Sequence, residues 1–243
     1  KFITKQSIGR QKTPPLISVL DGNKEKGSAW KCTMNFYKFK SLECIEHASD
    51  IIINEQLYCA DYDKLNDPFE GLFFYIIRHG AFSPAFSNDF DSQVKECKNI
   101  LVPFKICSLS KELSDVRMWS FYANDHKGIA IEIDFTDFEK DIKEIHYSEA
   151  LPEYNLTTHE PHDLAEILTK KTNHWSYESE YRIIHENTYY SIKGRIKKIY
   201  LGQRILDIHL EILKKIIPSA IPIYTTKLDT SEIKIKPDKP LDK

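Results

Sequence analysis

Residues 175–182 have the sequence Trp-Ser-Tyr-Glu-Ser-Glu-Tyr-Arg, and the alternation of residue types predicts a strand over 178–184. Successive side chains of a strand point to opposite faces, so Glu178, Glu180 and Arg182 are expected in one row. Such a row also occurs on an ordinary solvated strand. The neighbouring aromatic rings favour a partly sheltered setting, in which the guanidinium of Arg182 holds one carboxylate ionised. The other carboxylate is then available to take a proton or to stabilise a cation.

Strand patterns outnumber helix patterns on both sides of this stretch. Apolar and alternating runs predict further strands at residues 36–39, 57–60, 104–109, 129–135, 142–147, 196–201 and 221–224. Helical spacing and capping residues predict helices at 42–52 after a Ser41 cap, 88–100, 118–123, 162–171 and 207–217 with Asp207 as the cap. Because few helices fall regularly between strands, the pattern predicts an α+β fold with mixed or antiparallel sheets and flanking helices.

Composition divides the chain into three parts. Residues 1–31 hold seven basic and two acidic residues, a net charge of +5, and are predicted to form a loosely ordered basic arm. A contact with nucleic acid or a partner is the functional alternative for this arm. Residues 32–226 are expected to fold as a single domain, which is long enough to bury a core. Residues 227–243, rich in Lys, Asp and Pro, are predicted to be a frayed tail.

Charge and cysteine usage limit the classes of protein. The net charge of −2 at pH 7 argues against nucleic-acid binding by bulk electrostatics. Five cysteines without a C-x-x-C pair argue against a disulfide framework and structural zinc, and favour a reducing, cytoplasmic compartment. No apolar run approaches the ~20 residues that span a bilayer, and the N-terminus lacks a secretory apolar region.

Several familiar sites are absent from the sequence. Neither G-x-x-x-x-G-K-[ST] nor G-x-G-x-x-G occurs, and the zinc motif H-E-x-x-H is also missing. His159-Glu160-Pro161-His162 is a dense His/acid run, but its proline prevents the helical presentation that such a metal motif needs. We interpret this run as a loop that starts the next helix, and we expect no metal.

Two further segments combine chemistry-bearing residues. Asn66-Asp67-Pro68-Phe69-Glu70-Gly71 has the composition of a turn, in which Phe69 packs into the core. Residues 118–122 contain Trp119 and Tyr122, which share a helix face, and His126-Lys127-Gly128 follows. The simplest interpretation of the second segment is a core stripe.

These segments together resemble a bacterial family, the domain-of-unknown-function family 2971. The matching motifs are, in chain order, Tyr37-Lys38, residues 66–70, Ile106-Cys107-Ser108, residues 118–123 with His126 and Gly128, and residues 175–182. The resemblance spans about residues 36–185, and the order of the motifs is intact. This chain has Phe121 where the family more often has His, which argues against catalysis at that position. The family name implies no activity.

The chain is also similar, more weakly, to mono-ADP-ribosyltransferases, which are small α+β domains. The similar positions are, in chain order, Tyr37-Lys38, Ser108 with Trp119 and Tyr122, and Glu178-x-Glu180. The first position departs from the usual His or Arg of those enzymes. This resemblance implies an ADP-ribosyltransferase-like fold and NAD as the substrate.

The same resemblance implies roles for individual residues. Glu180 would be the catalytic carboxylate that stabilises an oxocarbenium-like state, and Glu178 would position or deprotonate the acceptor. Contacts to NAD are assigned to Tyr37, Lys38, Asn66, Ser108, Trp119, Tyr122, Trp175 and Arg182. The expected activity is ADP-ribosyl transfer or NAD cleavage by a bacterial toxin or phage-defence effector. Its partners would be a protein or nucleic-acid acceptor and an antitoxin or another member of the defence system.

Two alternatives belong to other functional classes. In a metal-dependent nuclease, Asp67, Glu70, Glu178 and Glu180 would gather Mg²⁺ while Lys38 or Lys127 stabilises the transition state. In a non-catalytic module, the aromatic face would bind a nucleotide, peptide or partner, and the Glu/Arg row would be a structural ion network. The pKa values of Glu178 and Glu180 discriminate between a catalytic and a structural role. A catalytic Glu in a pocket has a raised pKa, and a Glu paired in an ion network has a lowered one.

Overall fold

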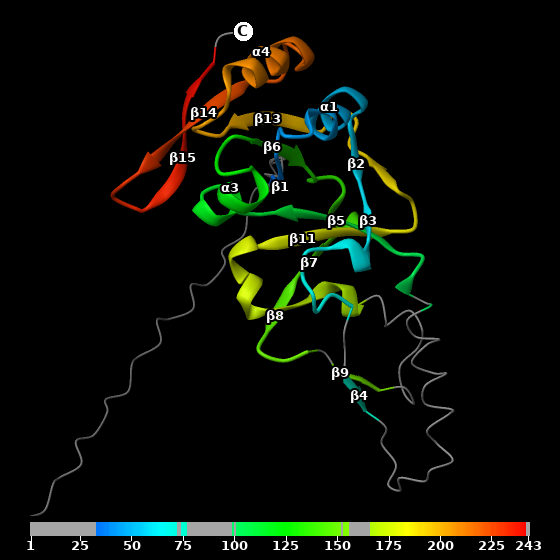
Figure 1. Ribbon diagram of the computed structural model, residues 1–243. Helices are drawn as coiled ribbons and strands as arrows, with labels where there is room; N and C mark the ends of the chain where they lie inside the picture. The colour runs from blue at the N-terminus through cyan, green and yellow to red at the C-terminus, as the bar shows by residue number, and fades with distance from the viewer. Residues whose placement is uncertain are drawn as a thin grey trace, which may run out of the picture. The chain divides into compact units, whose positions relative to one another are not determined.

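The computed structural model describes residues 33–71, 74–76, 99, 101–151, 153–155 and 166–241. The fold is α+β, as predicted, with a mostly antiparallel sheet of nine strands (Figure 1). Its strand order is β15-β14-β13-β6-β1-β5-β11-β7, and β3 also pairs with β5. The bounds of these strands are β1 Asn35–Lys40, β3 Ala60–Asp61, β5 Lys105–Ser110, β6 Ile129–Asp134, β7 Ile142–Glu144, β11 Glu180–His185, β13 Ile196–Leu201, β14 Ile223–Asp229 and β15 Lys234–Pro240.

Shorter strands form three pairs outside the main sheet. The strand β10 (Lys170–Thr172) runs parallel to β8 (His146–Ser148), with Lys171 opposite Tyr147. The other two pairs are β12 (Tyr189–Ser191) with β2 (Gln56–Tyr58), and β4 (Phe74–Ile76) with β9 (Glu153–Asn155). The β10–β8 pair matters for the site, because it brings Lys171 next to the start of β11.

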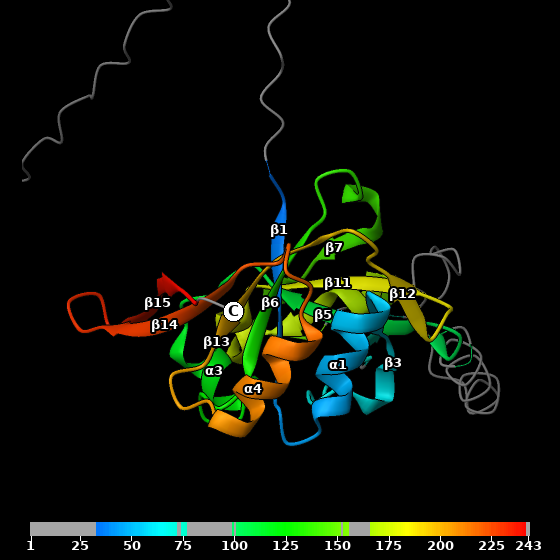
Figure 2. The same ribbon diagram turned by 90° about the horizontal axis from the view of Figure 1, so that it is seen from above.

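Each face of the main sheet has its own apolar core. Phe36 of β1 belongs to the larger core, to which α1 (Ile45–Asn54) and α4 (Asp207–Ile216) contribute side chains. Figure 2 shows these two helices side by side over the sheet. Phe39 lies three residues further along β1 and therefore on the other face, where it packs with Trp119 of α3 (Val116–Tyr122). Residues of even and odd number in β1 thus face different cores.

The helix starts differ from the sequence prediction. The α1 helix begins at Ile45, and the side chain of Ser41 accepts a hydrogen bond from the backbone N–H of Glu43 (3.1 Å) in the preceding turn. In α4, Asp207 is the first helical residue, Leu206 is the cap, and no side chain caps the helix. In both places the apolar face fixes the helix, and the predicted capping bonds are not formed.

The strand predicted over 178–184 begins two residues later. Glu178 ends a 3-10 helix, η5 (Asn173–Glu178), and Ser179 adopts a left-handed conformation with φ 43° before β11 starts at Glu180. Glu178 is therefore not part of the strand row. Only Glu180 and Arg182 share a strand face.

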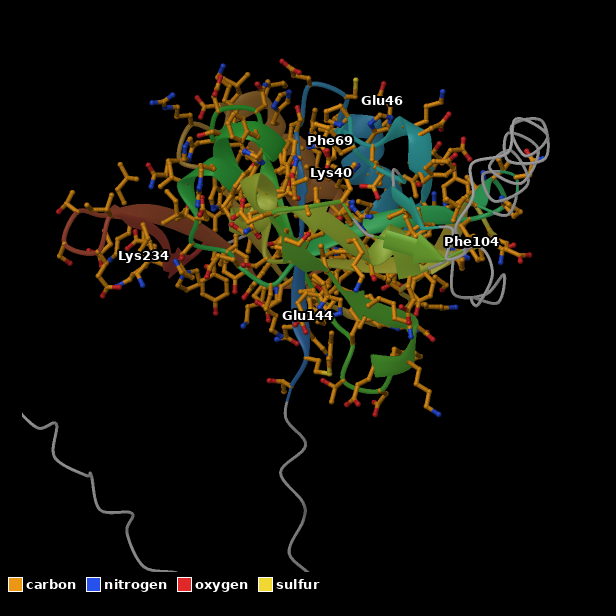
Figure 3. All side chains as sticks on the ribbon, turned by 90° about the horizontal axis from the view of Figure 1, so that it is seen from below. Lys40, Glu46, Phe69, Phe104, Glu144 and Lys234 are labelled. Carbon is orange, nitrogen blue, oxygen red and sulfur yellow. The ribbon has the colours of Figure 1, made fainter. Side chains whose placement is uncertain are left out.

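Other expectations are corrected or lie outside the described residues. Residues 166–169 are 3-10 helical and 170–172 form β10, so the helix predicted over 162–171 does not extend through them. Within the predicted tail, residues 234–240 form β15, which pairs with β14 along the edge of the sheet. In Figure 3, Lys234 of β15 stands well away from Glu144 of the opposite edge strand, β7. The basic arm, the run 159–162 and all but residue 99 of the helix predicted over 88–100 lie outside the described residues.

None of the helices in the described part of the chain combines the length and the apolar composition that crossing a bilayer requires.

Two glycines allow backbone segments to approach closely beside α3. A Cβ at Gly128 would lie 2.1 Å from the carbonyl oxygen of Lys40, and a Cβ at Gly202 would lie 2.1 Å from that of His126. Both contacts are with backbone atoms, which cannot rotate away. The H-x-G motif of the sequence is therefore explained by packing at Gly128.

We expect Gly128→Ala to lower the free energy of unfolding by about 3 kcal/mol or more, because the added methyl group must displace β1. Gly194→Ala is the control, since its Cβ would meet no atom within 4 Å and only its φ of 73° opposes the change. We expect the control to cost about 1 kcal/mol. Urea denaturation measures both, and equal losses would show that the close approach at Gly128 is unimportant.

Candidate functional site

Arg182 is the centre of a buried ionic network. It lies on β11 and is fully buried, and its Nη1 and Nη2 donate to Oε1 and Oε2 of Glu70 at 2.6 and 2.7 Å. Its Nε donates to Oε1 of Glu180 (2.7 Å), and Nη1 also donates to the carbonyl of Leu168 (2.6 Å). The guanidinium therefore joins β11 to the turn at residues 66–71 and to the segment before β10.

Lys171 is the second cation of the network. Its Nζ donates to Oε2 of Glu178 (2.5 Å) and to Oε2 of Glu180 (2.9 Å), and it lies 4.8 Å from the centre of the Trp175 ring. Burial by itself lowers the pKa of Lys171, but Glu180 and Glu178 outweigh burial and raise the pKa above its usual value. Lys171 is therefore a fixed positive charge.

Glu180 is held by both cations. Burial opposes its ionisation, but Arg182 and Lys171 outweigh burial and lower the pKa of Glu180 to about 2. Its backbone N–H also donates to the hydroxyl of Tyr147 (2.8 Å). This carboxylate stays ionised and paired, as expected for a member of a structural ion network.

Glu178 has a different environment. Burial raises its pKa, the negative charge of Glu180 raises it further, and Lys171 only partly offsets these effects. The hydroxyl of Tyr122 donates to Oε1 of Glu178 and accepts from Nδ2 of Asn66 (2.5 Å). Glu178 is therefore the carboxyl of the pair that is suited to proton transfer.

The sheet register aligns residues of three neighbouring strands, among them the predicted residues Tyr37 and Glu180. Ser110 of β5 lies opposite Tyr37 of β1 on one side and opposite Glu180 of β11 on the other. Directly opposed residues of a sheet point to the same face, so these three side chains form one row across three strands. Ser108 lies opposite Arg182 in the next row of that face. Tyr37 also packs edge-on against Tyr200, and burial raises its pKa to about 12.

Two predicted contact residues lie elsewhere. Trp119 is completely buried in the core, and its indole Nε1 donates to the carbonyl of Leu113 (2.7 Å). It therefore has no exposed surface for a ligand, and the core-stripe interpretation is correct for this residue. Lys38 follows Tyr37 in β1, so its side chain leaves the opposite face of the sheet, and its Nζ donates to the carbonyl of Ser108 (2.8 Å). The remaining predicted residues, Asn66, Ser108, Tyr122, Trp175 and Arg182, are on the side of the sheet that carries Glu180 or in the segments that cover it.

Lys171 was missed by the sequence prediction, and Glu70 was considered only as a metal ligand. Lys171 falls in a segment that the pattern predicts as a helix, so no strand pairing pointed to it. Glu70 belongs to the turn motif at residues 66–71, and its acidic side chain was the one feature of the sequence that could have indicated its place in the network. The pairing of Arg182 with two buried carboxylates depends on tertiary contacts, which the spacing of residues in the sequence does not predict.

The four carboxylates of the nuclease hypothesis do not form a metal site in the described residues. Glu70, Glu178 and Glu180 converge, but they converge on Arg182 and Lys171. Asp67 accepts a hydrogen bond from the backbone N–H of Phe69 (2.9 Å) within its turn. Across the part of the chain that is described, no group of three or more His, Cys, Asp or Glu residues is arranged to hold a metal ion.

A cavity of about 400 Å³ lies beside the start of β11. It is lined in part by Lys111, Tyr147, Ser176, Ser179 and Glu180. Further aromatic surface follows along η5 and α3, where Tyr177 lies next to Trp175 (ring centres 6.3 Å apart) and to the exposed Phe121 (6.3 Å). The guanidinium of Arg117 lies 4.3 Å from the centre of the Tyr177 ring.

Comparison with family models matches residues 118–183 to a family described as a protein of unknown function (DUF2971). The matched segment includes Tyr122, Lys171, Glu178, Glu180 and Arg182, so it contains most of the network. The chain is similar to that family over this segment, and the description assigns no activity to it. No curated protein and no solved structure matches the chain.

We expect Arg182→Met to lower the free energy of unfolding by about 3–5 kcal/mol, because Glu70 and Glu180 would stay buried without their cation. Arg117→Met is the matched control, since Arg117 pairs with Asp115 on the surface and exposed pairs contribute little. Chemical denaturation measures both variants. A mild effect at Arg182, equal to that at Arg117, would contradict the role of the network in the fold.

The lowered pKa of Glu180 predicts a loss of stability in acid. The contribution of Glu180 is fully present above the ordinary pKa of 4.5 and is lost as the pH falls toward 2. We expect Glu180→Gln to make the decline of stability between pH 4.5 and 2 shallower, by about 3 kcal/mol over that range. Glu178→Gln should leave this decline in place, because a carboxyl with a raised pKa does not lose stability on acidification. Unfolding titrations at several pH values test the pair, and an unchanged acid limb in Glu180→Gln would contradict the assignment.

Proposed function

We propose that the protein uses NAD as a substrate, for ADP-ribosyl transfer or for NAD cleavage. The observation that carries this proposal is the row of Tyr37, Ser110 and Glu180 across three neighbouring strands. Tyr37 and Glu180 are motif positions of the resemblance to mono-ADP-ribosyltransferases and are far apart in the sequence, and Ser110 stands between them; the motif residue Ser108 lies in the next row of the same face. An ADP-ribosyltransferase-like fold is part of the proposal.

The two carboxylates divide the chemistry between them. Glu178 can hold a proton closer to neutral pH, because burial raises its pKa, and it is hydrogen-bonded to Tyr122. We assign to Glu178 the contact with the ribose or with the acceptor hydroxyl, where charge or a proton develops during cleavage of the nicotinamide–ribose bond. Glu180 is assigned the role of holding Lys171 and Arg182 in place. This reverses the roles that the sequence resemblance implies for the two residues.

The surroundings of Glu178 and Glu180 fit a nucleotide. The 400 Å³ cavity beside Glu180 is within the usual range for small-molecule sites, and its lining includes the cation of Lys111 together with the carboxylates of Glu112, Glu144 and Glu180. The rings of Tyr177 and Trp175 offer flat surfaces on which a nicotinamide or adenine ring can stack. In the cell, the proposed context is a cytoplasmic toxin or phage-defence effector that modifies a protein or nucleic acid and is restrained by an antitoxin or another defence protein.

A non-catalytic binding module is the second candidate. It is favoured by one observation, the complete pairing of Glu180 with Arg182 and Lys171 and its lowered pKa. In that case the aromatic surface binds a nucleotide or a partner, and the ion network only stabilises the fold.

Incubation of the purified protein with NAD, followed by measurement of free nicotinamide, tests the proposal. We expect release by the wild type and at least a 100-fold loss in Glu178→Gln, the size typical for loss of a general acid or base, with an unchanged melting temperature. Glu180→Gln should lose both nicotinamide release and thermal stability, because it leaves Lys171 and Arg182 underpaired.

The pattern of outcomes separates the candidates. A rise in melting temperature with NAD but no nicotinamide release, with or without protein and nucleic-acid acceptors, would favour the binding module. If NAD causes no rise in melting temperature and no nicotinamide is released, NAD is excluded as the ligand.

A further inference from the structure

A pair of buried thiols lies on the sheet face opposite to the carboxylates. Cys107 belongs to β5 and Cys59 directly precedes β3, and both are about 1% exposed in the larger core. The pairs Ala60–Ile106 and Asp61–Lys105 set the register of the two strands, so Cys59 is opposite Cys107. Opposed residues of antiparallel strands have Cα atoms about 4.5–5.5 Å apart, which is within the range that a disulfide bridges. The thiol of Cys59 donates to the carbonyl of Leu57 (3.8 Å), and the thiol of Cys107 donates to the carbonyl of Ser108 (3.9 Å).

Positive charge favours a thiolate at Cys107. The neighbouring Cys59 thiol and the ammonium group of Lys38 outweigh burial and lower the pKa of Cys107 to about 6. Lys40 lies close enough to act in the same direction, and burial together with Lys38 lowers the pKa of Lys40 to about 8. The pKa of Cys59 is raised, because the neighbouring sulfur of Cys107 and burial both disfavour its ionisation. The pair thus consists of one nucleophilic sulfur and one protonated partner.

His185 contacts the protonated sulfur. Its Nε2 lies 3.3 Å from Sγ of Cys59, and its Nδ1 accepts a hydrogen bond from the backbone N–H of Asn187 (3.1 Å). Since Nδ1 is the acceptor, the neutral ring carries its hydrogen on Nε2 and donates it to Cys59. The backbone N–H of Cys59 donates to the carbonyl of Thr188 (2.8 Å) in the exposed turn 186–189.

We propose that Cys59 and Cys107 form a redox-active dithiol that hydrogen peroxide converts to a disulfide. The Cys107 thiolate attacks one peroxide oxygen, the O–O bond breaks, and the leaving oxygen takes a proton and departs as water. Cys59 then attacks the sulfur of the Cys107 sulfenic acid, so that the S–S bond forms, the S–O bond breaks and a second water leaves. The two thiols lose two electrons, which reduce the peroxide, and a dithiol reductant reverses the change.

This dithiol is a separate feature from the proposed NAD site. The side chains of Cys107 and Ser108 leave opposite faces of β5, and Ser108 lies opposite Arg182. The Lys38 ammonium lies near the sulfur of Cys107 and donates to the backbone carbonyl of the adjacent residue, Ser108 (2.8 Å). Oxidation removes the thiolate that Lys38 faces.

The test uses the reduced 243-residue chain, hydrogen peroxide, and alkylation of the remaining thiols followed by peptide mass mapping. We expect two of the five cysteines to lose reactivity, Cys59 and Cys107 to be recovered as one linked peptide, and reduction to restore both. Cys59→Ser should stop the reaction at a Cys107 sulfenic acid, which dimedone traps.

Charge variants test the role of the lysine. Lys38→Met should slow disulfide formation several-fold, while Lys38→Arg, which keeps the charge, should stay within twofold of the wild type. Cys44→Ser is the control for the surface thiol and should form the same disulfide. The proposal is overturned if Cys107 stays open to alkylation under peroxide that oxidises Cys44, or if the linked peptide contains another cysteine.

Discussion

The burial of one guanidinium constrains the rest of the structure. Arg182 has no contact with water, so each of its donors has to find an acceptor inside the protein. Glu70, Glu180 and the carbonyl of Leu168 supply those acceptors from three segments, of which the turn that carries Glu70 is far from the other two in the sequence. Because leaving a buried charge unpaired costs several kcal/mol, the three segments are stable only when they are assembled together.

The same network leaves an imbalance of charge. Glu70, Glu178 and Glu180 face two cations, Lys171 and Arg182, so one negative charge is not matched. The imbalance does not fall equally on the three carboxyls. The pKa of Glu180 is lowered by its two partners, whereas burial raises the pKa values of Glu178 and Glu70. Of these two, Glu70 is paired at both oxygens with the guanidinium of Arg182, whereas Glu178 has a tyrosine hydroxyl at its second oxygen.

Local pattern predicted much of the fold but not the partners within the site. Alternation identified β1, β6 and β13 closely, because each is a strand with a buried apolar face. The break at Ser179 was not predictable, since a left-handed serine has no sequence signature comparable to glycine. The importance of Glu178, Glu180 and Arg182 was recognisable from their spacing. Lys171 was not, because a lysine is usually exposed and only the pairing of β10 with β8 buries it.

The strand β15 also determines how the sheet ends. Its sequence alternates lysines with Pro237 and Pro240, and a proline has no N–H to offer to an incoming strand. The exposed edge of β15 is therefore a poor template for pairing with a second chain. The neighbouring seven-residue strand β14 would be a good template if β15 did not cover its edge. A segment that looks dispensable by composition thus protects the molecule from edge-to-edge aggregation, and shortening the chain before β15 would remove that protection.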